Sequence, residues 1–541
     1  MKKVQRIALG IIVFGLVMFL GVSLSQRDRR PGRQPPEDRV GPSIPSTRSD
    51  SRDETQYLVF VINWEGLFEA SRSGMPSIIN KNLTELIDRV GTVGTTRRKL
   101  GFTVLIPPWI LEKGRPGKYP MVIKEIFNAA RQNNIAAHLS IETHYFWDAR
   151  PDLWNYFDPS KPGYDPNNKN NVEWSDWKGT PYPARYVDWG TPQKLAPHMC
   201  YNAPKIRSEI ARLVTQFLAP PIKAELDALK SEGREYLFAG ITVGSEPSLD
   251  NYEKIGAINI GLARFMDKQR APKVQLGYNA LHNLGYSQSR PPKDMSRALA
   301  EVNRDFIAYW GKHFVEAGIP MSRLYTHVAA NSGYVGSPAL EFTNAPIWIA
   351  FNDYTRPGWT TYPDGPLEKS FDLFYNELKK HGDPGWGGTE ASPQGLGEAR
   401  IPVDAYLKRH YDHGAKIIVM NIHATGQHLT QKLSQGVWGG DAVAAYRSFL
   451  GGTMSRAERR TEVAAPDSPS ENPDQERIRK KVQKVASTLQ EWHSKRVDPA
   501  KIQTLGDYMN EIAELLRAVK PQQAEAKADE ALDYVNRQNL R

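Results

Sequence analysis

The sequence predicts an α/β protein whose main domain is a (β/α)8 barrel with long loop insertions after the third and fourth strands. Eight short apolar runs recur between residues 56 and 450. Longer amphipathic stretches separate several of these runs, for example 204–219 and 295–317. Strands that alternate with helices form a parallel sheet, and eight such repeats close the sheet into a barrel.

The expected strands are the apolar runs themselves. They are 57–63, 102–107, 135–142, 237–246, 324–330, 347–353, 385–390 and 416–422. A doubly wound open sheet is the alternative fold, and it carries a glycine-rich phosphate loop after its first strand. Here the first strand is followed by Trp64-Glu65-Gly66, so the barrel is preferred.

The two insertions are rich in aromatic residues. Residues 147–201 follow the third strand, and residues 251–292, with Tyr278, His282 and Tyr286, follow the fourth. Both leave the C-terminal ends of strands, where barrels of this class carry their active sites. We therefore expect these loops to form the walls of a cleft.

The N-terminus predicts export. Three basic residues precede an apolar run from Ile7 to Leu24, which is typical of a signal peptide or a membrane anchor, here residues 1–25. Residues 26–55 are rich in Arg, Pro and Ser and predict a disordered linker. We expect an exported body that is either secreted or held at a membrane by an N-terminal helix.

The C-terminal part predicts a separate helical unit. The barrel domain is expected at 56–452, followed by a charged, proline-containing linker at 453–475. Residues 476–541 carry apolar residues at heptad spacing, which predicts a helical hairpin or a small bundle. Packing on the barrel and self-association both remain open for this unit.

Composition excludes several functions. The net charge is +10, but residues 1–33 hold seven basic residues and one acidic residue, so +6 of it lies there. The remainder, +4, predicts no nucleic-acid partner. With Cys200 as the single cysteine, neither an internal disulfide nor a cysteine-based zinc site can form.

Two glutamates stand where predicted strands end. Glu246 ends the fourth apolar run, and Glu390 ends the seventh, glycine-rich run. Parallel strands end at one rim, so these side chains are expected to face each other. Hydrolysis of a glycosidic bond uses one carboxyl group as acid and a second as nucleophile or base. The pair therefore predicts a glycoside hydrolase that acts on a carbohydrate and requires no metal and no organic cofactor.

Other polar and aromatic residues near the strand ends are candidates for binding sugar hydroxyls and ring faces. They are Asn63, Trp64, Trp109, Glu142, His144, Trp147, Asn331, Trp386 and His423.

These motifs resemble the glycoside hydrolases of clan A, which are (β/α)8 barrels. The resemblance implies an acid/base glutamate at Glu246, a nucleophile at Glu390 and a retaining mechanism. In the clan an asparagine usually precedes the acid/base residue, whereas this chain has Ser245. His327 is similar to the histidine near strand five, and Tyr354 to the tyrosine that bonds the nucleophile.

Two alternatives remain beside this hypothesis. A metal-dependent hydrolase on the same barrel would draw ligands from His138, Glu142, His144, His423 and His428. A barrel without catalysis would bind carbohydrate only, and the serine that precedes Glu246 is its main support.

Overall fold

The computed structural model describes most of the barrel domain and part of the C-terminal segment. The described residues are 54–451 with gaps at 63–66, 69, 72, 115–116, 145, 184, 188–192, 252–273, 330–344, 364–370, 395–399 and 422–437, then 481, 484–485, 488, 501, 504–505, 507–508, 511–512 and 521–539. The chain divides into two compact units. One comprises 1–185, 195–251 and 275–454, and the other 186–194, 252–274 and 455–541.

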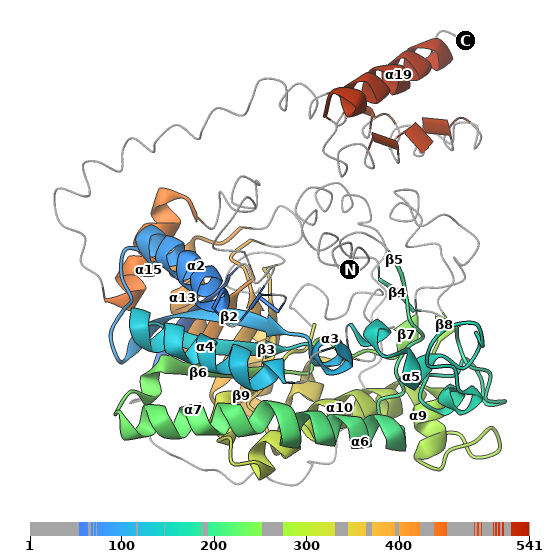
Figure 1. Ribbon diagram of the computed structural model, residues 1–541, viewed down its shortest axis with the longest axis horizontal. Coiled ribbons are helices and arrows are strands. Elements are labelled where there is room, and N and C mark those ends of the chain that lie inside the picture. Colours follow the sequence, from blue (N-terminus) through green and yellow to red (C-terminus); the bar gives the residue numbers. More distant parts are fainter. Residues whose placement is uncertain are drawn as a thin grey trace. The chain divides into compact units, whose positions relative to one another are not determined.

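Eight parallel strands form the central sheet of the first unit (Figure 1). The strand order is β10-β11-β12-β1-β2-β3-β6-β9. Their bounds are β1 Gln56–Val61, β2 Arg98–Ile106, β3 Ala136–Ile141, β6 Phe238–Val243, β9 Leu324–Thr326, β10 Gly358–Thr361, β11 Trp386–Ala391 and β12 Ala415–Met420.

Backbone hydrogen bonds join the two ends of this strand order. The N–H of Thr326 donates to the carbonyl of Arg356, and the N–H of Thr360 donates to the carbonyl of Val328, both at 3.0 Å. Parallel bridges pair Tyr325 with Arg356 and Val328 with Trp359. The sheet is therefore a closed (β/α)8 barrel, as the sequence predicts.

Side chains alternate between the barrel interior and the helical layer. Tyr57 and Val59 on β1 pack inside with Tyr325 and Ile417, whereas Leu58 belongs to the large outer core. This period of two is what the apolar runs encode. The outer core is continuous and contains most of the buried aliphatic and aromatic residues of the unit.

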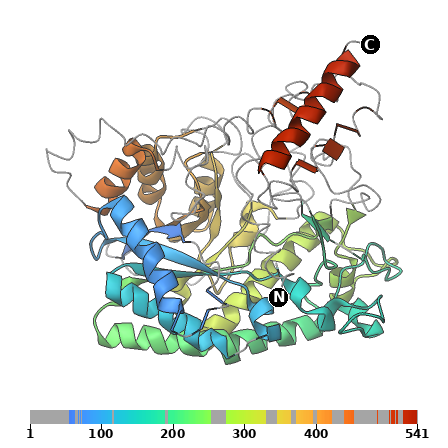
Figure 2. The ribbon, with the colours of Figure 1, turned by 45° about the horizontal axis from the view of Figure 1, so that its top comes forward.

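The helical layer follows the strands in sequence and lies on the outside of the barrel (Figures 1 and 2). Its α-helices are α2 Met75–Val90, α3 Pro108–Gly114, α4 Lys118–Asn133, α6 Pro204–Arg212, α7 Ala219–Ser231, α10 Met295–Glu316, α12 Asp372–Lys380, α13 Val403–Asp412 and α15 Gly440–Leu450. Short turns of other helix types are η3 Leu213–Leu218, a π-helix between α6 and α7, and the 3₁₀ turns η4 Glu235–Leu237, η5 Met321–Arg323 and η6 Ile347–Ala350.

The sixth strand lies later in the chain than the sequence predicts. The apolar run expected as a strand at 347–353 forms the 3₁₀ turn η6, and the strand is Gly358–Thr361. A turn separates the two, in which the Asn352 side chain accepts from the Tyr354 N–H at 2.9 Å. The apolar run packs against α10 and α12 instead of joining the sheet.

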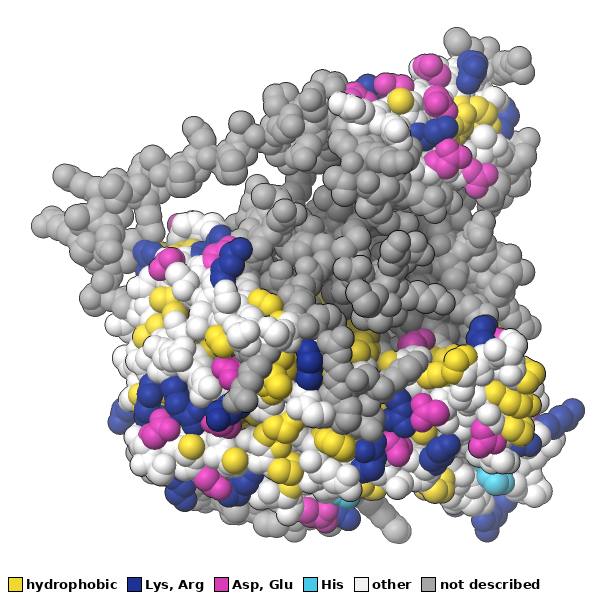
Figure 3. Space-filling view, in the orientation of Figure 1, with side chains coloured by type: hydrophobic (Ala, Val, Ile, Leu, Met, Phe, Trp, Pro, Cys, Tyr) yellow, Lys and Arg dark blue, Asp and Glu magenta, His cyan; other side chains and the backbone are white. Residues whose placement is uncertain are grey.

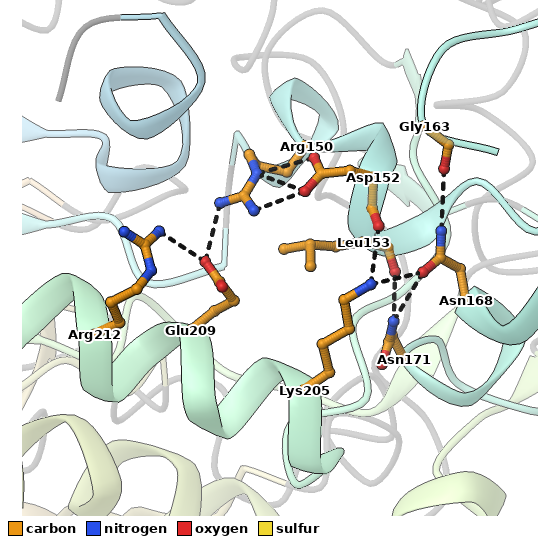
Figure 4. Close-up of polar contacts among 9 residues, drawn as sticks. All are labelled: Arg150, Asp152, Leu153, Gly163, Asn168, Asn171, Lys205, Glu209 and Arg212. Carbon is orange, nitrogen blue, oxygen red and sulfur yellow. Dashed lines mark hydrogen bonds and ion pairs between the residues drawn. The ribbon is translucent and has the colours of Figure 1, made fainter. Parts of the chain in front are cut away.

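The insertion after β3 is structured and bonded to α6. It contains η1 Trp147–Ala149, α5 Pro151–Trp154, η2 Pro166–Asn170, β4 Arg185–Val187 and β5 Gln193–Leu195. Figure 4 shows Arg150 paired with Asp152 at 2.7 Å and with Glu209 of α6 at 3.3 Å. Lys205 of α6 donates to the Asp152 carbonyl at 3.2 Å and to the Asn168 side chain at 3.3 Å. These contacts fix the loop to the helical layer.

The described part of the insertion after β6 is shorter. It contains β7 Asp250–Asn251, β8 Val274–Gln275 and α9 Tyr278–Asn283. On the face of the molecule in Figure 3, Lys and Arg side chains are interspersed with Asp and Glu side chains over the described surface.

The second unit contains a long helix, α19 Pro521–Asn539. Its Ala531 and Val535 pack on Val485 and Leu505, and Lys481 pairs with Glu525 at 2.9 Å. The expected N-terminal anchor at 1–25 and the expected linker at 453–475 lie outside the described residues. Of the expected linker at 26–55, only residues 54 and 55 are described. Among the residues that are described, no helix combines the length and the apolar character needed to cross a bilayer.

Candidate active site

Side chains from six strands meet at the carboxyl ends of the barrel strands. Each one stands on or just after a strand, so the shared direction of the strands brings them to one rim. They are Glu142 after β3, Ser245 and Glu246 after β6, His327 after β9, Thr360 and Tyr362 on and after β10, Glu390 on β11 and Asn421 after β12.

The backbone at Glu246 is held in an unusual conformation. Its φ is +50°, in the left-handed region, and Gly244 two residues earlier has φ +86°. A residue with a side chain adopts this region at a cost of about 1–3 kcal/mol. Neighbouring strands hold it there, because the Glu246 N–H donates to the His327 carbonyl and the His327 N–H donates to the Val243 carbonyl, both at 3.0 Å.

The two predicted catalytic glutamates converge on His327. Its Nε2 lies 3.2 Å from Glu390 Oε2 and 3.6 Å from Glu246 Oε1. One side-chain oxygen of each glutamate and a ring nitrogen of His327 all lie within 4.8 Å of one another. Both glutamate side chains are about a quarter exposed, so the cluster is open to a ligand. Thr360 Oγ1 lies 3.2 Å from His327 Nε2.

Glu390 is surrounded by hydrogen-bond donors. The Tyr362 hydroxyl donates to Glu390 Oε1, and Asn421 Nδ2 donates to the Tyr362 hydroxyl at 3.0 Å. Burial acts to raise the Glu390 pKa, but the hydrogen bond and charge of His327 and the hydrogen bonds of Tyr362 and Asn421 outweigh it. The net direction is a lowered pKa, which keeps Glu390 ionised.

His327 is the positive charge of the cluster. Burial alone would lower its pKa, but the hydrogen bond to Glu390 and the charges of Glu246, Glu390 and Glu142 raise the pKa to about 9. The ring is therefore protonated at neutral pH and donates to Glu390. Glu246, His327 and Glu390 each offer one ligand atom within 4.8 Å of the others, so the cluster also has the donor set of a metal site.

Glu142 adds a third carboxyl group to the site. Burial raises the Glu142 pKa to about 7; His327 and a hydrogen bond with Ser245 act against this, and the charges of Glu246 and Glu390 add to it. Its backbone N–H donates to the Ile106 carbonyl at 3.0 Å, which extends the pairing of β2 with β3.

Ser245 joins the two carboxylate-bearing segments. Its hydroxyl donates to the Ile141 carbonyl at 3.0 Å and accepts from the Thr143 N–H at 3.2 Å. The serine therefore bonds the residues on both sides of Glu142. It is buried, and its role in the structure is to connect loops rather than to present a free hydroxyl to a ligand.

Several predicted binding residues lie in the core instead. Trp109, His144 and Trp147 are all buried, and Trp109 Nε1 donates to the Thr143 carbonyl at 3.0 Å. Their rings are packed in the core and expose almost no surface. This burial does not support the prediction that they contact substrate, because aromatic residues at strand ends fill the core as readily as they line a site.

Two further candidates lie at the other end of their strands. Trp386 begins β11, is fully buried, and donates from Nε1 to the His413 carbonyl at 2.8 Å. Tyr354 precedes β10, at the end opposite to Glu390. The sixth strand lies later in the chain than the sequence predicts, so the tyrosine just beyond its C-terminal end is Tyr362 and not Tyr354. Tyr362 forms the hydrogen bond to Glu390 that was expected of Tyr354.

The remaining candidates are unevenly described. Asn63, Trp64, Asn331, His423 and His428 lie outside the described residues. In the alternative metal set, His138 is fully buried between Thr103 at 2.8 Å and Thr242 at 3.1 Å. Burial lowers its pKa to about 3, so it is a neutral core histidine.

The residues missed by the sequence interpretation are Thr360, Tyr362 and Asn421. Asn421 directly follows β12, a strand that the sequence does predict, so its position at the rim could have been inferred. Thr360 and Tyr362 depend on the correct position of β10.

Comparisons with known proteins support no family assignment. No protein-family model matches the sequence, and a search of curated proteins finds no match. Among solved structures, the chain is similar to the catalytic domain of a beta-amylase from Paenibacillus polymyxa, with 10% identity over 73% of this chain and 98% of that one, at a TM-score of 0.41. It is also similar to xylanase B from Clostridium stercorarium F9, with 11% identity over 70% and 88%, at a TM-score of 0.28. At these scores the likeness carries no argument about function.

Proposed function

We propose that this chain is a glycoside hydrolase that cleaves O-glycosidic bonds of an oligo- or polysaccharide with retention of configuration. One observation carries the proposal. Two glutamates from β6 and β11, which are separated by β9 and β10 in the barrel, bring oxygens within 4.8 Å of each other beside His327. Retaining enzymes place their carboxyl groups about 5–5.5 Å apart, and inverting enzymes about 6.5–9.5 Å apart.

In the first step Glu390 attacks the anomeric carbon of the sugar. A bond forms between a Glu390 carboxylate oxygen and that carbon, while the bond from carbon to the leaving oxygen breaks. Glu246 donates its proton to the leaving oxygen. The positive charge of His327 and the donors Tyr362 and Asn421 support this role, because they keep Glu390 ionised.

In the second step water completes the hydrolysis. Glu246, now ionised, removes a proton from water as the water oxygen attacks the anomeric carbon. The bond to Glu390 breaks, the carboxylate is regenerated, and Glu246 is protonated again. No metal ion takes part in either step.

The test is a pair of isosteric variants with a matched control. Glu246→Gln and Glu390→Gln should each lower kcat on aryl glycosides or soluble polysaccharides by about 10²–10⁴-fold or more while sugar binding persists. Glu377→Gln removes a glutamate of α12 that pairs with Lys380 at 2.9 Å, outside the cluster, and should leave kcat unchanged. Equal activity of all three variants would contradict the assignment.

Covalent trapping tests the retaining mechanism separately. A fluorosugar should label Glu390, as found by peptide mass spectrometry. Azide should restore turnover to Glu390→Gly and give a glycosyl azide of inverted configuration. Hydrolysis without any trapped intermediate would indicate inversion instead.

The same measurements separate the alternatives. A carbohydrate-binding barrel without catalysis would bind sugar but show no turnover in wild type or in either glutamine variant. A metal-dependent hydrolase would lose activity on chelation. We further propose that the chain is exported, and that residues 1–25 attach it to a membrane; cell fractionation of the full chain tests both. We also propose that the chain self-associates through residues 476–541, which light scattering of the full chain tests.

A further inference from the structure

His327 presents a single ring nitrogen to three oxygen atoms of the site. Its Nε2 lies 3.2 Å from Glu390 Oε2, 3.2 Å from Thr360 Oγ1 and 3.6 Å from Glu246 Oε1. This nitrogen carries at most one proton, so one hydrogen-bond donor faces three acceptors. An ionised carboxylate is the strongest acceptor of the three, and of the two glutamates Glu390 lies closer to the ring nitrogen.

Thr360 connects the histidine to Glu246. Its hydroxyl is buried, and it has one proton and two lone pairs, so it can accept from His327 and donate to Glu246 at the same time. The hydroxyl lies 3.5 Å from Glu246 Oε1, at the long limit of a hydrogen bond. Because Thr360 on β10 is the register partner of Glu390 on β11, the sheet itself holds the hydroxyl in the cluster.

The proposed reaction moves the negative charge from one glutamate of the pair to the other. Before the first step Glu390 is ionised and Glu246 carries the proton. In the glycosyl-enzyme Glu390 is an uncharged ester, and Glu246 is ionised because it has given its proton to the leaving oxygen. A carboxylate of the pair therefore needs a donor at both stages, and it is a different carboxylate each time.

We propose that His327 redirects its N–H from Glu390 to Glu246 between the two steps, and that the Thr360 hydroxyl completes the bond to Glu246. This inference rests on the proposed function. Thr360 is a positioning residue: it acts through His327 and Glu246 and forms no bond to the sugar. The contacts to Glu246, at 3.5 Å and 3.6 Å, are long in the free enzyme, where the donor is engaged with Glu390. They should shorten once Glu390 is esterified.

The first experiment measures the two steps separately on a dinitrophenyl glycoside, whose leaving group departs without a proton. Here kcat/KM reports the first step, and kcat reports hydrolysis of the glycosyl-enzyme, which a burst of dinitrophenolate identifies as the slower step. Thr360→Val removes the hydroxyl and keeps the shape of the side chain. It should leave kcat/KM within about twofold of wild type and lower kcat by about 10–100-fold, the effect of one hydrogen bond to a charged group. Thr360→Ser keeps the hydroxyl and should retain kcat.

The matched control is Thr103→Val. Thr103 is also a buried threonine beside a histidine, with its Oγ1 2.8 Å from His138 Nδ1, but this pair stands on β2 and β3 and is not part of the cluster. Its replacement removes the same group and should leave the ratio of kcat to kcat/KM as in wild type. Equal losses of kcat and kcat/KM in Thr360→Val, or no loss of either, would overturn the proposal.

The second experiment needs no turnover and so separates this inference from the proposed function. Glu390→Gln replaces the carboxylate by an uncharged amide, which reproduces the charge of the esterified residue. Crystal structures of wild type and of this variant should show the distance from His327 Nε2 to Glu246 Oε1 shortening from 3.6 Å to about 3 Å. An unchanged distance would overturn the proposal. A shortened distance in a protein that hydrolyses no glycoside would contradict only the proposed function.

Discussion

Replacement of Tyr362 by phenylalanine removes the hydrogen bond that the Tyr362 hydroxyl donates to Glu390, and with it the acceptor of the Asn421 side-chain amide. Burial raises the pKa of the Tyr362 hydroxyl well above 10, so it remains a donor at all working pH values. A hydrogen bond to a charged group contributes about 1.5–3 kcal/mol. At 1.36 kcal/mol per pKa unit, this corresponds to about 1–2 units in the Glu390 pKa.

The sign follows from the charge of the nucleophile. The hydrogen bond stabilises ionised Glu390, so its loss raises the Glu390 pKa, and activity is lost at a higher pH on acidification. The acidic limb of kcat/KM on an aryl glycoside should therefore move up by about 1–2 units in Tyr362→Phe. The stability that the lowered Glu390 pKa provides is present above pH 4.5 and is lost as pH falls through the folded-state pKa. Because the Glu390 pKa is lowered less in Tyr362→Phe, the variant should lose less stability than wild type over this pH range.

Tyr354→Phe is the control, because Tyr354 lies at the opposite end of β10. Its acidic limb should coincide with that of wild type. The reasoning is refuted if Tyr362→Phe also leaves the limb in place, or if Tyr354→Phe moves it.

Two further predictions concern stability. An alanine Cβ at Gly101 would lie 2.8 Å from Val59 Cγ2 inside the barrel, so Gly101→Ala should lower the free energy of unfolding, measured in urea, by about 1–3 kcal/mol. The control is Gly117→Ala, whose Cβ would have no neighbouring atom within 4 Å and which should change the free energy of unfolding by less than about 0.5 kcal/mol. Trp386→Phe loses the bond to the His413 carbonyl and core volume, and should lower stability by roughly 1–3 kcal/mol while kcat stays within about twofold; a large fall in kcat would return Trp386 to the site.

A strand could be predicted from the sequence where its own residues are mostly apolar. Phe238–Val243 is buried at every position, and all its residues except Gly240 and Thr242 have apolar side chains. Gly358–Thr361 was missed because half of this strand is threonine, and Thr360 faces the polar site. The nearby run Ile347–Ala350 is more apolar, yet it packs against helices. Only tertiary packing distinguishes the two segments.

The convergence of Glu246 and Glu390 was predictable for the same reason, whereas the contact of Tyr362 with Glu390 was not. Glu246 and Glu390 each stand at the end of a local pattern, and a parallel barrel brings all such ends together. Trp147 and Tyr362 are both aromatic residues just beyond a strand. One fills the core and the other bonds Glu390, and this choice depends on the direction of each side chain rather than on its type.

The strain at Glu246 bears on whether the barrel is an enzyme or only a binding protein. A non-glycine residue at φ +50° and a partly buried cluster of three carboxyl groups with one imidazolium both cost free energy of folding. A binding site for neutral sugars needs neither, because hydroxyl groups are recognised by amides and by ordinary, unstrained side chains. A hydrolase has a use for the charged cluster, because its acid must stay protonated beside an ionised nucleophile. The left-handed turn brings Glu246 to His327, with Glu246 Oε1 3.6 Å from His327 Nε2. If this is correct, Glu246→Gly should stabilise the fold by relieving the strain and at the same time abolish turnover, a combination that a purely structural glutamate would not give.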